Sequence, residues 1–107
     1  MDGEQNFVRV GTLAEIPDGE VRAFDFPGVR VSVANLSGEV RAFADECPYG
    51  GCSLAEGELT DDGTVVCAVD GSEFDLETGE PVRGPAVDPI PILHARTQDG
   101  WVEVALG

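Results

Sequence analysis

Apolar and polar residues alternate along the first half of the chain with a period of two, the repeat of a half-buried β-strand. Turn residues such as Pro-Gly and Ser-Gly interrupt this alternation at short intervals. Residues 12–19 leave room for one helical turn at most, and no longer helical period is visible. The pattern predicts strands over residues 7–10, 21–26, 29–34 and 39–44, the last two forming a hairpin.

The second half of the chain has shorter alternating segments. Asp99-Gly100 predicts the turn of a closing hairpin. Residues 81–91 hold four prolines, and we expect them to be irregular. Strands are expected over residues 57–60, 64–66, 73–76, 92–97 and 101–106. The pattern therefore predicts a single all-β domain, a sandwich or barrel of short antiparallel strands.

The composition fits one compact domain with an acidic surface. The 107 residues, 42% of them hydrophobic, are enough for one core. The formal net charge of −15 argues against nucleic acids and anionic membranes as partners, because both are negative. Eleven carboxylates and no basic side chain fall within residues 42–82. This concentration fits either simple solubility or docking on a basic partner surface.

The ends and the cysteine count bear on the cellular compartment. The chain begins MDGEQN, without the basic and apolar segments of an export signal. No apolar run approaches the roughly eighteen residues of a membrane span. We therefore expect a cytoplasmic protein, in which thiols stay reduced. Three cysteines, an odd number, also fit metal binding better than a disulfide framework.

The candidate chemistry lies in two short Gly-bearing loops that contain Cys47, Cys52 and Cys67. Small iron–sulfur domains present metal ligands from two facing loops in this way. No His or Lys neighbours these cysteines to lower a thiol pKa, so an electron-transfer or accessory role is favoured over catalysis. The single histidine, His94, falls on a predicted terminal strand and is expected to be a surface residue.

The segments around the cysteines resemble those of Rieske-type ferredoxins: DECP at 45–48, CSLAEG at 52–57 and GSEFDLETG at 71–79. In that family loop one reads C-x-H-x-G and loop two reads C-x-x-H-G. One Cys from each loop holds one iron of a [2Fe-2S] cluster, and one His from each loop holds the other. The resemblance implies a Rieske-type antiparallel β-sandwich with a two-loop, cluster-binding subdomain at about residues 45–84. It also implies an electron-transfer component of a multicomponent, oxygenase-type system that docks on a redox partner through its acidic loop end.

Both histidine positions of the family pattern are substituted in this chain. Tyr49 stands in the first loop and Asp70 in the second, and His94 lies too far along the chain to replace two ligands. The usual two-Cys, two-His cluster therefore cannot form.

Three alternatives remain for the site. In the first, an iron–sulfur cluster binds with atypical ligation, because thiolate, carboxylate and phenolate groups all bind iron. Its candidate ligands are Cys47, Cys67 and Asp70, with Tyr49 and Cys52 as further candidates. Replacing neutral imidazoles with anions predicts a potential below the roughly −150 to +300 mV of His-ligated centres. Some Rieske proteins carry a disulfide cysteine at the position of Cys52, but its usual partner position is Val69 here, so the resemblance implies a free thiol.

In the second alternative the chain is a cluster-free accessory subunit, as the small subunit of some nitrite reductases is by resemblance. Tyr49 would then fill the cluster pocket and Asp70 would bond to loop amides. Cys47 and Cys67 would be buried thiols or an oxidised pair across the loops. In the third alternative, a single zinc or iron ion binds to the cysteines and Asp70.

Overall fold

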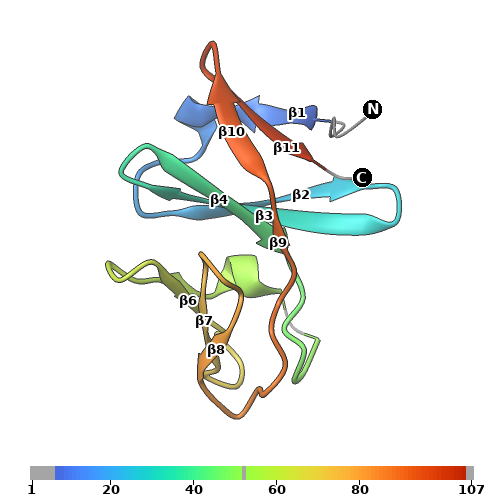
Figure 1. Cartoon of the computed structure of the whole chain (residues 1–107), viewed down its shortest axis with the longest axis vertical. Helices are drawn as coiled ribbons and strands as arrows, with labels where there is room; N and C mark the ends of the chain where they lie inside the picture. The colour runs from blue at the N-terminus through green and yellow to red at the C-terminus, as the bar shows by residue number, and fades with distance from the viewer. Residues whose placement is uncertain (1–6, 52, 106–107) are drawn as a thin grey trace.

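The structure, a computed structural model, describes residues 7–51 and 53–105. Cys52 and the last residue of the predicted strand 101–106 therefore lie outside the described residues. The described chain forms three antiparallel sheets with two short 3₁₀ turns, η1 (Leu13–Glu15) and η2 (Leu54–Glu56) (Figure 1). The prediction of an all-β fold is confirmed.

The first two sheets form the body of the molecule (Figure 1). The first sheet has the order β1-β11-β10, with bounds Phe7–Thr12, Trp101–Ala105 and Ala95–Gln98. The second has the order β2-β3-β4-β9, with bounds Val21–Phe26, Val29–Leu36, Glu39–Ala44 and Ile92–Leu93. Their facing side chains form one apolar core, whose fully buried members include Val31, Val33, Val102 and Val104. The alternation of the sequence places these valines inward, as expected for a sandwich.

The predicted strand over residues 92–97 is divided in the structure, which corrects that prediction. β9 pairs with β4, where Leu93 lies opposite Ala42, whereas β10 pairs with β11. The chain passes from the second sheet to the first at His94. The alternating residues 92–97 therefore contribute strands to two different sheets. His94 is exposed, as expected, and its ring centroid lies 5.8 Å from that of Phe7.

The third sheet lies below the second one, at the opposite end of the molecule from the first sheet (Figure 1). Its order is β5-β6-β7-β8, with bounds Glu58–Leu59, Thr64–Val66, Glu73–Asp75 and Pro81–Arg83. The expectation that all of residues 81–91 are irregular is wrong at its start, because β8 forms there. Pro81 opens an edge strand, where a missing N–H is tolerated.

A second apolar core joins the second and third sheets beneath the cysteine loops. Its fully buried large side chains are Phe43, Leu54, Val65, Phe74 and Leu76. Cys47 and Cys67 belong to the same cluster. Burying each such side chain stabilises the fold by about 1.5–3 kcal/mol. The two loops are therefore anchored on a packed base. Within the described residues, no helix is long and apolar enough to cross a membrane.

Candidate functional site

The two cysteine loops are built in the same way. In the first, the Gly51 N–H donates a hydrogen bond to the Cys47 carbonyl at 2.7 Å. In the second, the Gly71 N–H donates to the Cys67 carbonyl at 3.0 Å. Both glycines have positive φ, 75° and 80°, a conformation that glycine adopts without steric cost. Each loop thus turns the chain tightly just after its cysteine.

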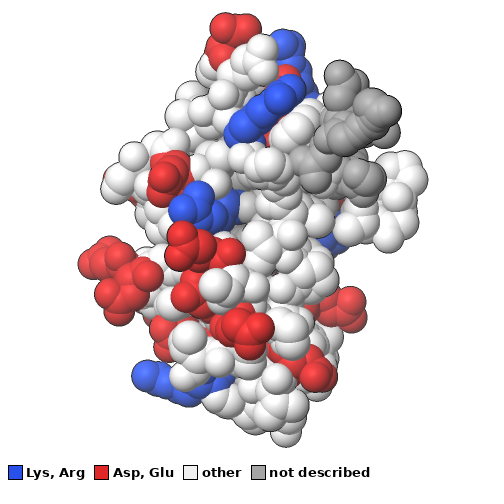
Figure 2. Space-filling model, viewed as in Figure 1, with Lys and Arg blue, Asp and Glu red and all other residues white. Residues whose placement is uncertain are grey.

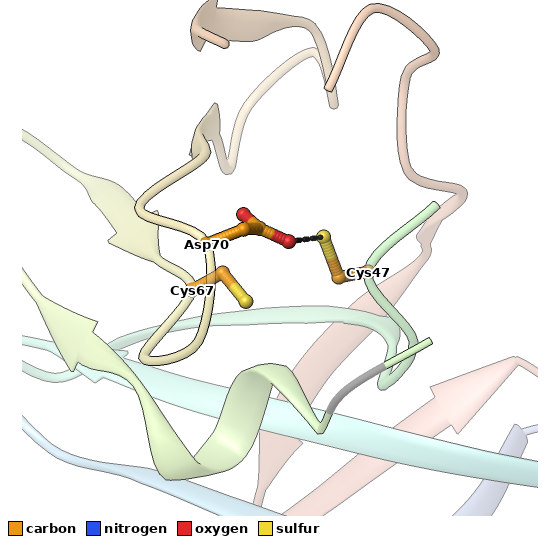
Figure 3. Close-up of side chains that lie close together, drawn as sticks. All are labelled: Cys47, Cys67 and Asp70. Atoms are coloured by element: carbon orange, nitrogen blue, oxygen red, sulfur yellow. Dashed lines mark hydrogen bonds between the residues drawn. The ribbon is translucent and has the colours of Figure 1, made fainter. Parts of the chain in front are cut away.

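These turns bring three side chains of the candidate site together (Figure 3). Ligand atoms of Cys47, Cys67 and Asp70 all lie within 4.8 Å of one another. Each cysteine is only 1% exposed, and Asp70 is half-buried. The Cys47 thiol donates a hydrogen bond to Oδ2 of Asp70 at 3.4 Å. Three predicted site residues from two loops therefore lie together, the two cysteines buried and the carboxylate partly open to water.

Asp70 is held as a carboxylate by its own loop. The Ser72 N–H donates to Oδ1 of Asp70 at 2.8 Å. Hydrogen bonds from the Ser72 side chain and backbone lower the pKa of the Asp70 carboxyl, and the Cys47 thiol acts in the same direction. Asp70 therefore stays ionised at neutral pH and offers an anionic oxygen to the space between the cysteines.

The second loop is also tied to the Pro-rich segment that follows β8. Ser72 is fully buried, and its hydroxyl oxygen accepts the Ala86 N–H at 2.9 Å. The Cys67 N–H donates to the Ser72 carbonyl at 2.8 Å. One serine thus fixes both the loop backbone and the Asp70 carboxylate.

Asp45 performs the corresponding role for the first loop. Its side chain is fully buried at the end of β4 and accepts hydrogen bonds from the hydroxyl of Ser32 on β3 and the hydroxyl of Ser53 beyond the loop. It also accepts the Ala55 N–H at 2.7 Å and pairs with Nε of Arg30 at 3.1 Å. Sequence reasoning missed Asp45 and Ser72 as positioning residues. The signal available was their placement, Asp45 just before the first loop and Ser72 at the end of the second.

The two described cysteines differ in oxidation state. Cys47 is a free thiol, whereas Cys67 is disulfide-bonded. An oxidised pair between Cys47 and Cys67, one of the options expected for a cluster-free site, is therefore wrong. The expected free thiol at Cys52 lies outside the described residues.

Tyr49 does not fill the space between the cysteines. Its side chain is 62% exposed, so the interpretation of Tyr49 as a plug of the pocket is wrong. The expected hydrogen bond from a loop amide to Asp70 is present, from Ser72. His94 lies between β9 and β10, beside Phe7. It therefore belongs to neither cysteine loop.

Comparison with known proteins matches the architecture to one family. The family model of the Rieske [2Fe-2S] domain matches residues 6–94. The chain is 34% identical over 94 residues to the 3-phenylpropionate/cinnamic acid dioxygenase ferredoxin subunit of Escherichia coli K12, and the match covers 88% of each chain.

Solved structures give the same result. The ferredoxin of carbazole 1,9a-dioxygenase from Nocardioides aromaticivorans IC177 superposes with a TM-score of 0.88 at 28% identity, covering 92% of this chain and 96% of that one. The Sphingomonas yanoikuyae B1 ferredoxin superposes with a TM-score of 0.87 at 29% identity, covering 95% and 100%. The Rieske-type sandwich expected from the loop motifs is confirmed. This chain belongs to the Rieske [2Fe-2S] domain family.

Proposed function

We propose that this chain is the ferredoxin-type electron-transfer component of a multicomponent oxygenase system. The observation that carries the proposal is the match, over 88% of both chains, to a ferredoxin subunit of a dioxygenase. Two relatives of similar length, at 34% and 28% identity, are named as ferredoxin components of dioxygenases. This chain has two cysteine loops, which contain Cys47 and Cys67 and support such a role.

The residues present do not fit the family's usual cluster ligation. Two imidazole ligands are required, and the chain contains a single histidine, His94, which lies outside the loops. The corresponding loop positions hold Tyr49 and Asp70. A two-Cys, two-His centre is therefore not part of the proposed function.

The donor set supports an atypical ligation instead. Cys47, Cys67 and Asp70 would be the ligands, and the exposed Tyr49 phenol or Cys52 would complete the set. Thiolates and carboxylates are both established ligands for iron. An iron–sulfur cluster supplies one-electron redox chemistry when bound. The chain's own contribution is to bury the cysteines, to keep Asp70 ionised through Ser72 and to hold the first loop on Asp45.

The charge around the loops supports docking on a basic surface of the oxygenase. Carboxylates gather over the third-sheet half of the face shown in Figure 2. Arg83 is the one basic residue in the stretch 45–84. Beside the site, Val69 and Val87 are 77% and 82% exposed. An apolar centre with a charged surround is the usual anatomy of a specific interface, and the acidic charge would steer the encounter. A structure at 27% identity and TM-score 0.88 is that of a complex of oxygenase and ferredoxin in carbazole 1,9a-dioxygenase.

A second candidate function is a cluster-free accessory subunit of a redox complex. The disulfide at Cys67 favours it, because that sulfur is not a thiolate ligand in this state. The Cys47–Asp70 hydrogen bond also satisfies two polar groups without a metal. The same docking surface would serve this role.

Iron and acid-labile sulfide assays on protein purified without oxygen and with reductant separate the two candidates. The electron-transfer proposal expects a brown protein with about two iron and two sulfide per chain after reconstitution. A colourless protein without iron or sulfide, even after reconstitution, would contradict the electron-transfer proposal and favour the accessory subunit. Co-purification with a large oxygenase subunit then tests the accessory role, and loss of that association would remove it as well.

A further inference from the structure

The outer face of the first sheet carries a row of charged side chains across its three strands. Val102 and Val104 pack in the core, so the alternate residues of β11, Glu103 among them, lie on the outer face. Glu103 lies opposite Arg9 of β1 on one side and opposite Arg96 of β10 on the other. Nε of Arg96 donates to Oε1 of Glu103 at 2.8 Å, and Nε of Arg9 donates to Oε2 at 3.4 Å. One buried carboxylate therefore holds two guanidinium groups in place.

Two aromatic rings flank this row. The guanidinium group of Arg9 lies over the Trp101 ring, 5.0 Å from its centroid, and that of Arg96 lies 3.8 Å from the centroid of the Phe7 ring. Stacking on a ring helps to fix the plane of a guanidinium group. Trp101 is 36% exposed, and the side chains of Arg9 and Arg96 are 53% and 49% exposed. The face therefore presents preorganised tryptophan and arginine side chains, which are enriched at the energetic centres of protein interfaces.

The two arginines have more hydrogen-bond donors than Glu103 can accept. Each guanidinium group has five N–H donors and a carboxylate has about four acceptor sites, so about six of the ten donors are left for water or a partner. The three strands of this sheet carry two arginines and one glutamate, an excess of one positive charge. A carboxylate from another molecule would therefore find both donors and a favourable charge on this face.

This positive excess lies far from the acidic loop end, in a chain whose formal net charge is −15. Basic side chains cross the first-sheet half of the face shown in Figure 2, and carboxylates gather over the third-sheet half. The first and third sheets lie at opposite ends of the longest dimension of the molecule, which is 38 Å (Figure 1). A partner bound on the first sheet would therefore leave the cysteine loops uncovered.

The overall charge limits what can dock on this face. A polyanion such as a nucleic acid or an anionic membrane would meet the repulsion of the whole acidic chain as well as the attraction of two arginines. A short segment with few carboxylates would be affected mainly by charges within about 8 Å at physiological ionic strength. An apolar residue between those carboxylates would contact the exposed part of the Trp101 ring. The face is thus complementary to a short acidic segment with an apolar centre.

We propose that Arg9, Arg96 and Trp101 form a second docking face, which binds a short acidic segment of another protein through carboxylates that flank an apolar residue. The face lies apart from the cysteine loops, so it does not depend on the proposed electron-transfer function. It allows one partner to hold the chain while another meets the loops.

A peptide titration followed by NMR tests this face directly. Trp101 is the only tryptophan of the chain, so its indole N–H is a single reporter at the face. The probe is the blocked pentapeptide EELEE, added to the isotope-labelled full chain without iron or sulfide. We expect saturable shifts of the Trp101 indole N–H and of the β10 amides, with no shift of the Gly51 and Gly71 amides in the loops. The uncharged peptide QQLQQ should bind at least about threefold more weakly, and added salt should weaken the binding of EELEE.

Variants with matched charge changes make the assignment specific. Arg9→Gln together with Arg96→Gln should weaken EELEE binding by at least about threefold. Arg22→Gln together with Arg41→Gln is the control, because it removes the same charge from the second sheet and should leave the affinity unchanged. Equal weakening by both pairs would show a general effect of net charge and would overturn the face.

The wild-type chain alone can also overturn the proposal, so a variant that fails to fold does not decide it. Absence of a saturable shift, or shifts at the loop glycines in place of Trp101, would do so. Shifts of Trp101 on concentrating the chain without peptide would assign the face to a second copy and overturn it as well. Because the titration needs no cluster, these results are independent of whether the chain carries electrons.

Discussion

The Cys47 thiol and the Asp70 carboxylate, which come from different loops, are joined by a hydrogen bond of 3.4 Å. Asp70 occupies the position at which the Rieske loop motif has a histidine. The bond shows that the second loop directs this side chain toward the first cysteine. Side chains from both loops therefore meet, with a carboxylate and a thiol in contact.

Restoring both histidines should restore the usual ligation. Tyr49→His and Asp70→His together would supply the two missing imidazoles on loops that already hold Cys47 and Cys67. We expect the double variant, reconstituted with iron and sulfide under reductant, to show a potential within roughly −150 to +300 mV. Protein-film voltammetry measures it. Each single variant is the matched control and should not reach this range; failure of the double variant to bind a cluster would show that the loops have lost more than two ligands.

The buried carboxylate of Asp45 should be a main support of the first loop. Asp45→Ala leaves the part-buried Ala55 N–H and the buried Ser32 hydroxyl without their acceptor, and the loss at Ser32 alone costs about 1–3 kcal/mol. Asp25→Asn is the control, because Asp25 pairs with the same Arg30 but its side chain is 80% exposed. Its effect should stay within about 0.5 kcal/mol. Urea unfolding measures both, and equal destabilisation would contradict the assigned role.

Acid should weaken the first sheet through Glu103. Hydrogen bonds from Arg96 and Arg9 lower the pKa of this carboxyl below its ordinary value of 4.5, against the opposing effect of burial. Stability from these contacts is complete above pH 4.5 and is lost as the pH falls through the lower folded-state pKa. Glu103→Gln should therefore destabilise the chain at neutral pH and flatten its acid dependence. Glu39→Gln, in an exposed pair with Arg41, is the control; an unchanged acid profile in Glu103→Gln would contradict this assignment.

Gly79 should tolerate no side chain. It has φ +85°, and a Cβ there would lie 2.2 Å from the Ile90 carbonyl oxygen. Gly28 has φ +83° but nothing within 4 Å of such an atom. Both alanine variants carry the backbone cost of positive φ, about 1–2 kcal/mol, and only Gly79→Ala adds a clash. Thermal melting should therefore show a clearly larger loss for Gly79→Ala, and equal losses would mean that the β7–β8 turn is not packed on Ile90.

Several strands could be predicted from alternation alone. β2, β4 and β6 form at the predicted residues, because each is a short run with apolar residues bounded by turn residues. β8 and the division at His94 could not be predicted, since they depend on which strand becomes the neighbour. The local pattern of apolar and polar residues does not show which strand a short segment pairs with.

The candidate site was only partly predictable for a similar reason. Loop motifs placed Cys47, Cys67 and Asp70 together, and the structure has this arrangement. The exposure of Tyr49, the disulfide at Cys67 and the buried contacts of Asp45 depend on packing. Residue identities do not carry that information, so these features became visible only in three dimensions.

The most direct test of the electron-transfer role is an anaerobic redox titration of the wild-type chain after reconstitution with iron and sulfide under reductant. We expect reversible uptake of about one electron per chain, at a potential below roughly −150 mV, because anionic ligands favour the oxidised state. A reconstituted chain that takes up no electron would contradict the proposed function, and a potential within the His-ligated range would contradict the atypical ligation.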